Sequence, residues 1–371
     1  MGRDFKCVCP GPPPVLKSVI LSVVMRRLLV LLFAVLLAGG LFAQKRKKKP
    51  DEEPRPQVLE VLPEPPEAVV AESGRLSFQI SPLSDKGLLS QQVRDALKAL
   101  ARLNHGASIL KLRAFVAGSG DLRRIKDIVA EEFTEKKQTL PAVSTIQVGA
   151  LPLPGAQVVI EATSSEKKVV NPDGVAFFSA AASANAAGSV AKLQTAVNNV
   201  GVKAPDVLRV TCFLSSLDDV QGARAAVAAA FPSAATNFLQ MQRLGLEQHA
   251  LCEGVARWIG IPVADAPQSG TALIKGKIVM TATQLVFRDQ DSDLRLAYQR
   301  MAKTLLPLGA TFKDVFWSGT YALTKPDASK LDSIQWEFLD RAHPPPHTAL
   351  QIEGLPSTDA TAAVEVMAVS R

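Results

Sequence analysis

The hydrophobic and polar positions along this chain repeat one pattern three times. In each copy a short apolar run, typical of a strand, is followed by a turn and by an amphipathic stretch with helical periodicity. An aromatic residue in each strand precedes an apolar residue of the next helix by 18 positions, in the pairs Phe115 and Phe133, Phe213 and Phe231, and Tyr321 and Leu339. The predicted strands are 110–116, 208–214 and 316–322, and the predicted helices are 121–133, 218–231 and 326–339. Such a repeat, of about a hundred residues, predicts three copies of one structural unit.

The second copy shows the order of elements within one unit. It opens with a strand at 175–179, directly after the turn sequence Asn171-Pro-Asp-Gly174. The remaining elements are a helix at 185–199, a strand at 207–214, a helix capped by Asp218 or Asp219, and strands at 237–242 and 250–257. We expect one sheet with both helices on one face, and the last two strands as a hairpin-like pair. The first copy runs from 76 to 163 and the third from 272 to 369.

The composition is that of a globular protein with little net charge on its folded part. Hydrophobic residues make up 47% of the chain and charged residues 21%, which argues against disorder throughout. The formal charge is +7, but from Ala68 onward the chain has 31 Lys and Arg against 28 Asp and Glu. Aromatic residues are only 5%, so neither a basic surface nor a stacking platform is indicated, and we expect no nucleic-acid partner.

The N-terminal end has the features of an export signal. Met25-Arg26-Arg27 is followed by an apolar stretch at 28–38 and by small residues before a cleavage point after Ala43. Residues 1–43 are therefore predicted to be a signal peptide, with the true start at Met1 or Met25, and the protein to be secreted or periplasmic. The alternative is an uncleaved signal anchor, which would be the only membrane attachment, and five basic residues at 45–49 oppose translocation.

The part of the chain after the signal divides into a tether and three units. Residues 44–69 are rich in Lys, Pro and Glu and are predicted to be disordered. The units are predicted at 70–164, 165–262 and 268–371. If residues 1–43 are removed, only Cys212 and Cys252 remain as cysteines. In an oxidising compartment these two can pair, and the alternative is a pair of small buried core residues.

Several motifs resemble the YjgF/RidA family, also known as endoribonuclease L-PSP. The family's G-N-L-V-F-V-S-G opening is similar to Gly174-Val-Ala-Phe-Phe-Ser-Ala180 and to Gly276-Lys-Ile-Val-Met-Thr-Ala282. The resemblance is closest in the second and third units. In the first and most divergent unit, the helix at 92–100 resembles the family's Q-x-x-x-x-L-x-N-L helix.

This resemblance implies an α+β fold of three tandem chorismate-mutase-like domains. Family members are homotrimers whose sites lie in clefts between subunits, and the deaminases among them hydrolyse imines and enamines. The chain is therefore expected to be a monomer that forms an intramolecular pseudo-trimer. A small-molecule ligand is expected in the clefts between its repeats.

The chain departs from the family at the residues that carry the deaminase chemistry. The deaminases need an arginine in a P-A-R-[ST] motif, because a guanidinium holds the substrate carboxylate with two parallel hydrogen bonds. The residues at this position are Val143, Thr236 and His347. In the family's last strand, V-E-I-E-A, the first glutamate faces the cleft. In this chain, Glu161, Glu253 and Glu365 align with the second glutamate of that motif. Glu253 aligns with the first glutamate if one alignment gap is shifted. The cleft position is otherwise occupied by Val159, Leu251 and Ala363.

Few residues remain that could form a site. The catalytic candidates are Glu253 as an acid or base, His347 as a pH-dependent cation in place of the arginine, and Ser179 as a nucleophile. The binding candidates are Thr236, Asn237 and Thr348. The structural alternatives are a solvated or salt-bridged strand glutamate for Glu253 and a loop histidine after three prolines for His347. With four histidines in the chain, we expect no metal site, and we expect no cofactor.

Two functions of different classes follow. The loss of all three arginines favours a protein that binds a small metabolite or a partner in its inter-domain clefts. The alternative is a hydrolase of the imine deaminase type with a diverged site. An endoribonuclease activity follows only from the family's other name.

Overall fold

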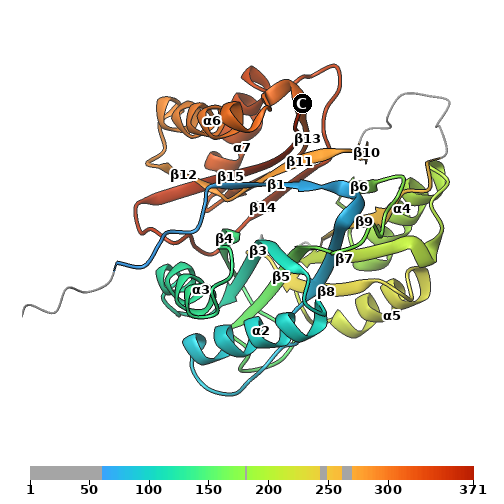
Figure 1. Ribbon diagram of the computed structural model, residues 1–371, viewed down its shortest axis with the longest axis horizontal. Coiled ribbons are helices and arrows are strands. Elements are labelled where there is room, and N and C mark those ends of the chain that lie inside the picture. The colour runs from blue at the N-terminus through green and yellow to red at the C-terminus, as the bar shows by residue number, and fades with distance from the viewer. Residues whose placement is uncertain (1–60, 180–181, 243–248, 261–269) are drawn as a thin grey trace, which may run out of the picture. The chain divides into compact units, whose positions relative to one another are not determined.

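The computed structural model describes residues 61–179, 182–242, 249–260 and 270–371. The predicted signal peptide and most of the predicted tether lie outside these residues. Within them, helices and three mixed sheets form an α+β fold (Figure 1).

The strands and helices follow one another in three groups along the chain. The first group is β2 (Leu76–Ile80), α2 (Leu89–Leu103), β3 (Ser108–Ala117), α3 (Arg123–Glu135), β4 (Ala142–Val148) and β5 (Val158–Ser165). The second is β6 (Val175–Ser179), α4 (Ala186–Asn199), β7 (Val207–Leu214), α5 (Val220–Ala230), β8 (Ala235–Gln240) and β9 (Ala250–Arg257). The third is β11 (Lys277–Thr281), β12 (Gln284–Phe287), α6 (Asp291–Leu305), β13 (Val315–Ala322), α7 (Lys325–Ile334), β14 (His347–Gln351) and β15 (Ala360–Val369). Two further strands, β1 (Ala68–Glu72) and β10 (Thr271–Ile274), precede the first and third groups.

The predicted strands and helices are present with small changes at their ends. Asp219 rather than Asp218 caps α5, because its Oδ1 accepts the Gly222 N–H at 3.2 Å. The helix predicted at 326–339 is shorter, since α7 ends at Ile334 and continues as a 3₁₀ turn, Gln335–Glu337. Gly174 N–H donates to the Asn171 carbonyl at 3.0 Å, which closes the predicted turn before β6.

The same ladder of three strands ends each sheet at one edge, and we call the middle strand of this ladder the central strand. The middle strand, which is β3, β7 or β13, is parallel to the strand on one side and antiparallel to the last strand of the group on the other. The prediction of a hairpin-like final pair is therefore wrong. A helix connects β3 to β4, and such a crossover makes them parallel neighbours, so that β5 pairs on the opposite edge of β3.

Two strands pair outside their own group. β1 pairs antiparallel with β11 of the third group, and β10 pairs antiparallel with β6 of the second. Figure 1 shows β1 running beside β11 before the chain turns into β2. Main-chain hydrogen bonds therefore connect segments that lie far apart in the sequence.

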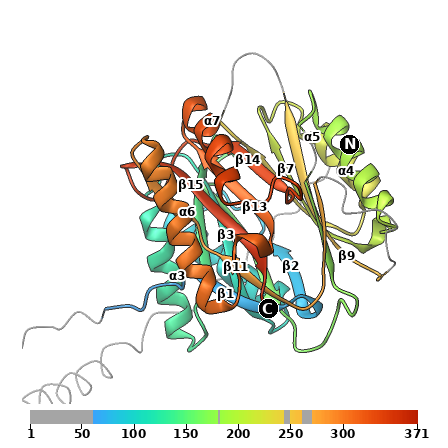
Figure 2. The ribbon, with the colours of Figure 1, turned by 90° about the horizontal axis from the view of Figure 1, so that it is seen from above.

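Each sheet has one face toward its helices and one toward the other sheets. In β3, Leu112 and Ala114 pack with α2 and α3, whereas Phe115 points to the opposite face. There it packs with Phe213 and Tyr321 of the other groups, and the rings of Phe115 and Phe213 lie 6.0 Å apart. In Figure 2, α6 and α7 cover the outer side of β13 and β15. A shared apolar core thus joins the three sheets.

The two cysteines of the second group form a disulfide between β7 and β9. Cys212 and Cys252 are directly opposite in the antiparallel ladder and both are fully buried. Of the two alternatives for these residues, the structure contains the pairing.

Candidate functional site

Three buried glutamates occupy the same place in the three sheets. Glu161, Glu253 and Glu365 lie opposite residues 113, 211 and 319 of the central strands, and at most 3% of each glutamate is exposed. Glu253 therefore has the same register as the other two and does not occupy the earlier position. All three carboxylates point toward the face on which the sheets meet.

Three buried cations from the central strands lie against these carboxylates. Arg113 contacts all three of them, with Nη1 2.7 Å from Glu253 and 3.4 Å from Glu161, and with Nε 3.4 Å from Glu365. Arg209 lies 3.4 Å from Glu161. Lys111 Nζ lies 3.1 Å from Glu365. We call these six charged residues the central ionic cluster.

Neutral donors complete the cluster in a cyclic order. Asn237 of the second group donates to Glu161 of the first at 2.9 Å. Thr348 of the third group donates to Glu253 of the second at 2.6 Å, and Ser144 of the first donates to Glu365 of the third at 2.6 Å. Each glutamate thus accepts a hydrogen bond from the neighbouring group. In each case the donor is the residue directly after the position at which the family has its arginine.

The positive charges within the cluster lower the pKa of two of its carboxylates, Glu161 and Glu365, despite their burial. Burial raises the pKa of Glu365, but the positive charges of Lys111 and Arg113 outweigh this effect and set its pKa at about 2. The pKa of Glu161 is also below its usual value, because Arg209 and Arg113 overcome the effect of burial. Burial lowers the pKa of Lys111, and the attraction of Glu365 opposes this only in part. The cluster is a set of ion pairs.

Sequence reasoning found the three glutamates but missed their cationic partners. The available signal was Lys111 and Arg113, two charged residues that alternate with apolar ones in a strand. Alternation places both on one face, and charged groups are almost never fully buried unless they are paired. Their partners were not foreseeable, because Arg113 and Glu253 are 140 positions apart in the sequence.

A pocket of about 250 Å³ lies between the second and third groups. The second group contributes Ala182, Met241, His249 and Leu251. The third contributes Thr320 and Ala322 from β13, Ala328 and Asp332 from α7, and His347, Ala349, Leu350 and Gln351 from β14. The lining is mostly apolar, with a few polar groups that could orient a small ligand.

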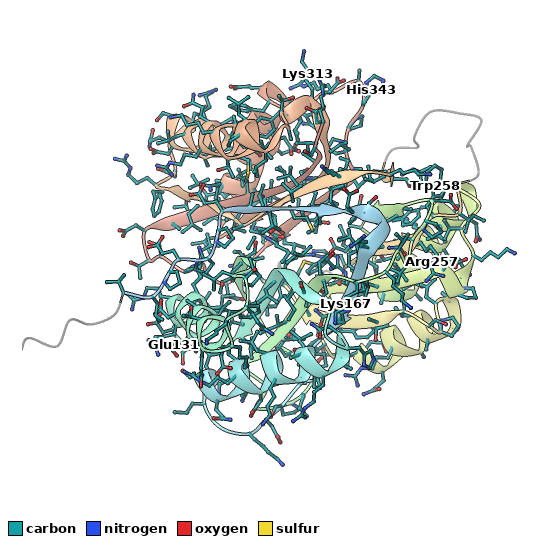
Figure 3. The ribbon with its side chains drawn as sticks, in the orientation of Figure 1. Glu131, Lys167, Arg257, Trp258, Lys313 and His343 are labelled. Carbon is teal, nitrogen blue, oxygen red and sulfur yellow. A yellow bond between two sulfur atoms is a disulfide. The ribbon has the colours of Figure 1, made fainter. Side chains whose placement is uncertain are left out.

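His347 is the altered arginine position that lines this pocket. Its Nδ1 lies 2.7 Å from Ser318 Oγ and its Nε2 lies 3.3 Å from Thr320 Oγ1. Burial lowers its pKa, and the negative charge of Asp332 opposes this only in part. The imidazole is therefore neutral at pH 7, with a hydroxyl near each nitrogen. Figure 3 shows that His343, four residues earlier, lies at the outer surface, where it contacts Asp340.

The other predicted site residues do not gather around His347. Glu253 and Thr348 belong to the central ionic cluster, as does Asn237 through Glu161. Thr236 is exposed. The Ser179 hydroxyl accepts the main-chain N–H of His347 at 3.2 Å, so it contacts the backbone of His347 rather than its ring. The pocket residues that sequence reasoning missed are His249, Thr320 and Asp332.

Two kinds of feature are absent from the described residues. Across residues 61–371, outside the three undescribed gaps, no group of His, Cys, Asp or Glu is arranged to hold a metal ion. In the same part of the chain, no helix has the length and hydropathy needed to span a bilayer.

Comparison with known proteins gives one sequence match and several structural likenesses. The model of the family Endoribonuclease L-PSP matches residues 66–166. We had expected the second and third units to be closest to this family, and the match lies instead on the first. A search of curated proteins gives no match.

The structural likenesses each extend over about a quarter of the chain. A YjgF/YER057c/UK114 family member from Mycobacterium tuberculosis is 18% identical, with 25% of this chain and 78% of that one covered and a TM-score of 0.23. RidA from an Antarctic Psychrobacter species is 18% identical, with 28% and 91% covered and a TM-score of 0.24. A putative endoribonuclease from Thermotoga maritima is 15% identical, with 29% and 90% covered and a TM-score of 0.24. The sequence match therefore supports the YjgF/RidA resemblance, and residues 66–166 are the part of the chain that carries it.

Proposed function

We propose that this chain is a monomer of three YjgF/RidA-like units, at 70–164, 165–262 and 268–371, which together form a pseudo-trimer. The cyclic hydrogen bonds from Asn237, Thr348 and Ser144 support this arrangement, because each connects one unit to the next. The shared core around Phe115, Phe213 and Tyr321 supports it as well. The inter-subunit clefts of the family would then lie within one chain.

We propose further that the protein binds a small molecule in the pocket between the second and third units and does not turn over imines. The observation that carries this proposal is the state of His347. A neutral imidazole already near two hydroxyls cannot form the paired, charge-assisted hydrogen bonds with which arginine holds a carboxylate. The chain thus retains a cleft while lacking the group that fixes the substrate.

The acidic group of the deaminase site is also missing from this pocket. Leu251 lines it at the position of the family's cleft glutamate, and a leucine cannot orient a water molecule. Glu253 is held by Arg113 and Thr348 in the central ionic cluster. Glu253 does not line the pocket and therefore cannot contact a ligand there, so we assign it a structural role.

The pocket chemistry favours an uncharged, polar ligand. Thr320, Gln351 and the histidines can exchange hydrogen bonds, and apolar side chains such as Leu251 and Leu350 cover the remaining surface. Asp332 is the only acidic group among the lining residues, and it would repel a carboxylate. A neutral amide should therefore bind better than the matching acid at pH 7.5.

Thermal unfolding of the full chain with matched ligands tests this proposal. We would compare pyruvamide with pyruvate, and 2-oxobutyramide with 2-oxobutyrate, since each pair differs in the charged group. A ligand that binds only the folded state raises Tm. We expect the amides to raise Tm more than the acids, and the effect to vanish in Ala349→Trp, which fills the pocket from an exposed position. A shift that persists in Ala349→Trp would place the binding elsewhere, and a larger shift with the acids would contradict the assigned ligand class.

A hydrolase with a diverged site is the second candidate. The observation in its favour is the pair of His347 and Ser318, whose Nδ1 and Oγ lie 2.7 Å apart as in an activated hydroxyl. Ser318 is only 3% exposed and is not among the residues that line the pocket, which limits access to it. If this candidate holds, a folded His347→Ala variant should lose turnover.

We also propose that the protein is exported to an oxidising compartment, either released or retained through an uncleaved N-terminal segment. The disulfide between Cys212 and Cys252 supports this location, because such bonds persist where thiols are not kept reduced. Fractionation of producing cells would test it, and a reduced protein found only in the cytosol would contradict it.

A further inference from the structure

The cleft between the first and third groups differs from the pocket at His347, because a segment of the chain lies across it. Two adjoining pockets of about 200 and 330 Å³ share Pro65, Lys126, Thr283 and Leu285, and so form one continuous groove. Residues 62–67, with the sequence Leu-Pro-Glu-Pro-Pro-Glu, contribute to the lining of this groove along its length. We call residues 62–67 the strap.

Two hydrogen bonds hold the end of the strap to the third group. Ala282 N–H donates to the Glu67 carbonyl at 2.6 Å. Thr304 of α6 donates its hydroxyl to Glu67 Oε2 at 2.7 Å. Pro65 and Pro66 are half-buried in the groove, and the strap continues directly into β1. Prolines restrict the free segment to extended conformations, so little entropy is lost when it docks.

The groove beneath the strap has two cations without a carboxylate partner among the described residues, although Arg300 donates to the Leu285 carbonyl at 3.5 Å and lies over the Phe287 ring. Lys126 of α3 and Arg300 of α6 both line it, and no ion pair of either is present in the described part of the chain. Thr283 and Gln284 are each 8% exposed, and their side chains have no hydrogen bond among the described residues. Val143 also lines the groove and carries no charge. Lys126 and Arg300, with a hydroxyl and an amide beside them, form a suitable environment for a small anion at this end of the groove, whereas Glu64 and Asp127 line the other end.

We propose that the strap is a built-in peptide ligand of this groove and restricts the access of small anions to Lys126 and Arg300. In the docked strap, the carboxylate at the rim of the groove is that of Glu67, which accepts a hydrogen bond from Thr304. When the strap is released, the two cations become available to a carboxylate or phosphate of similar size. This groove shares no lining residue with the pocket at His347, so the proposal does not rest on the small-molecule function given above.

Alkylation of a reporter cysteine tests the strap directly. The full chain would carry Cys7→Ser and Cys9→Ser, so that Thr283→Cys is its one free thiol, because Cys212 and Cys252 are paired. Glu67→Ala and Thr304→Val each remove the same hydrogen bond, one from either side. Loss of a hydrogen bond to a charged group should raise the alkylation rate about tenfold in either variant, with no further gain in the double variant.

The charge of the reagent tests the anion site. Iodoacetamide is neutral and iodoacetate is an anion, so the ratio of their alkylation rates reports on the charge of the groove. In the strap variants this ratio should shift toward iodoacetate relative to the parent, and Lys126→Met should abolish the shift. The matched control is Ala349→Cys in the other pocket, whose rates should be the same in all strap variants. Unchanged rates at Thr283→Cys, or equal gains at both reporters, would overturn the proposal.

Hydrogen exchange keeps the test decisive if Thr283→Cys does not fold. In the otherwise unaltered chain, Thr304→Val should speed exchange of the Ala282 amide, which donates to Glu67, while the Met241 amide, which donates to the Leu214 carbonyl, stays constant. An unchanged Ala282 amide would show that the strap is not held through Glu67.

Discussion

Arg113 donates a hydrogen bond to Glu253 at 2.7 Å, although 140 positions of sequence separate them. The same guanidinium lies within 3.4 Å of Glu161 and Glu365, so one side chain contacts carboxylates from all three groups. The residues at the matching register are Thr211 and Gly319, which are smaller and uncharged. In identical subunits, three such arginines would meet at the centre. The asymmetry of the cluster is therefore consistent with the proposed pseudo-trimer formed by a single chain.

Replacement of Arg113 by methionine should strongly destabilise the fold. The change leaves buried carboxylates without their shared cation, which typically costs about 3–5 kcal/mol in the free energy of unfolding. Urea denaturation of the full chain measures this. Arg123→Met is the matched control, because Arg123 pairs with Asp121 at the surface and such pairs contribute at most about 1 kcal/mol. Equal losses in the two variants would contradict the role given to Arg113.

Stability should fall in acid through Glu365. Its pKa is lowered from 4.5 to about 2 in the folded state, so the unfolded chain takes up the proton first. The contribution of Glu365 is complete above about pH 4.5 and is lost as the pH drops toward 2, and it amounts to about 3 kcal/mol. Urea denaturation between pH 6 and pH 3 should show a shallower decline in Glu365→Gln than in the parent.

The control for this pH dependence is Glu337→Gln. Glu337 is a surface residue that pairs with Arg295, so the acid decline should stay as steep as in the parent. If Glu365→Gln declines as steeply as the parent, Glu365 does not provide the acid sensitivity.

Loss of the disulfide should destabilise the second unit. Cys212 and Cys252 enclose a sequence separation of 40, for which chain entropy predicts a contribution of about 4 kcal/mol. The Tm of Cys212→Ala/Cys252→Ala should therefore be lower, and a reductant should lower the Tm of the parent but not that of the double variant. A parent that is insensitive to reductant under unfolding conditions would contradict this account.

The mass in solution should be that of one chain. Phe115, Phe213 and Tyr321 of the three groups pack in one core, so no second copy is needed to bury them. Light scattering should give about 39.6 kDa for the full chain, or slightly less after signal cleavage. A stable species of three chains would contradict the pseudo-trimer.

The elements that the sequence predicted well are those fixed by local pattern. Strands 175–179 and 250–257 match β6 and β9 at both ends, because turns bound their apolar runs. The exchange of β1 and β10 between sheets was not predictable in this way. β1 pairs with β11 about 200 positions away, and no local signal encodes that distance.

The candidate site shows the same division. His347 was found because a motif position can be read from the sequence, and the structure places it in a pocket. His249 and Asp332 were missed because they come from a loop and a helix that meet β14 only in the folded chain. Glu253 was taken for a candidate acid or base because its partners, Arg113 and Thr348, lie in other units.

Imine hydrolysis by the full, folded chain is the most direct test of the central claim, a family-like cleft without the family's chemistry. Enamines and imines would be generated in situ from several amino acids, and ammonia release would be followed with the parent, His347→Ala and Glu253→Gln. We predict release at the uncatalysed rate in all three, because no guanidinium lines the pocket at His347 and Leu251 stands at the position of the family's cleft glutamate. Turnover by the parent that is lost in folded His347→Ala or Glu253→Gln would contradict the account and establish a diverged hydrolase.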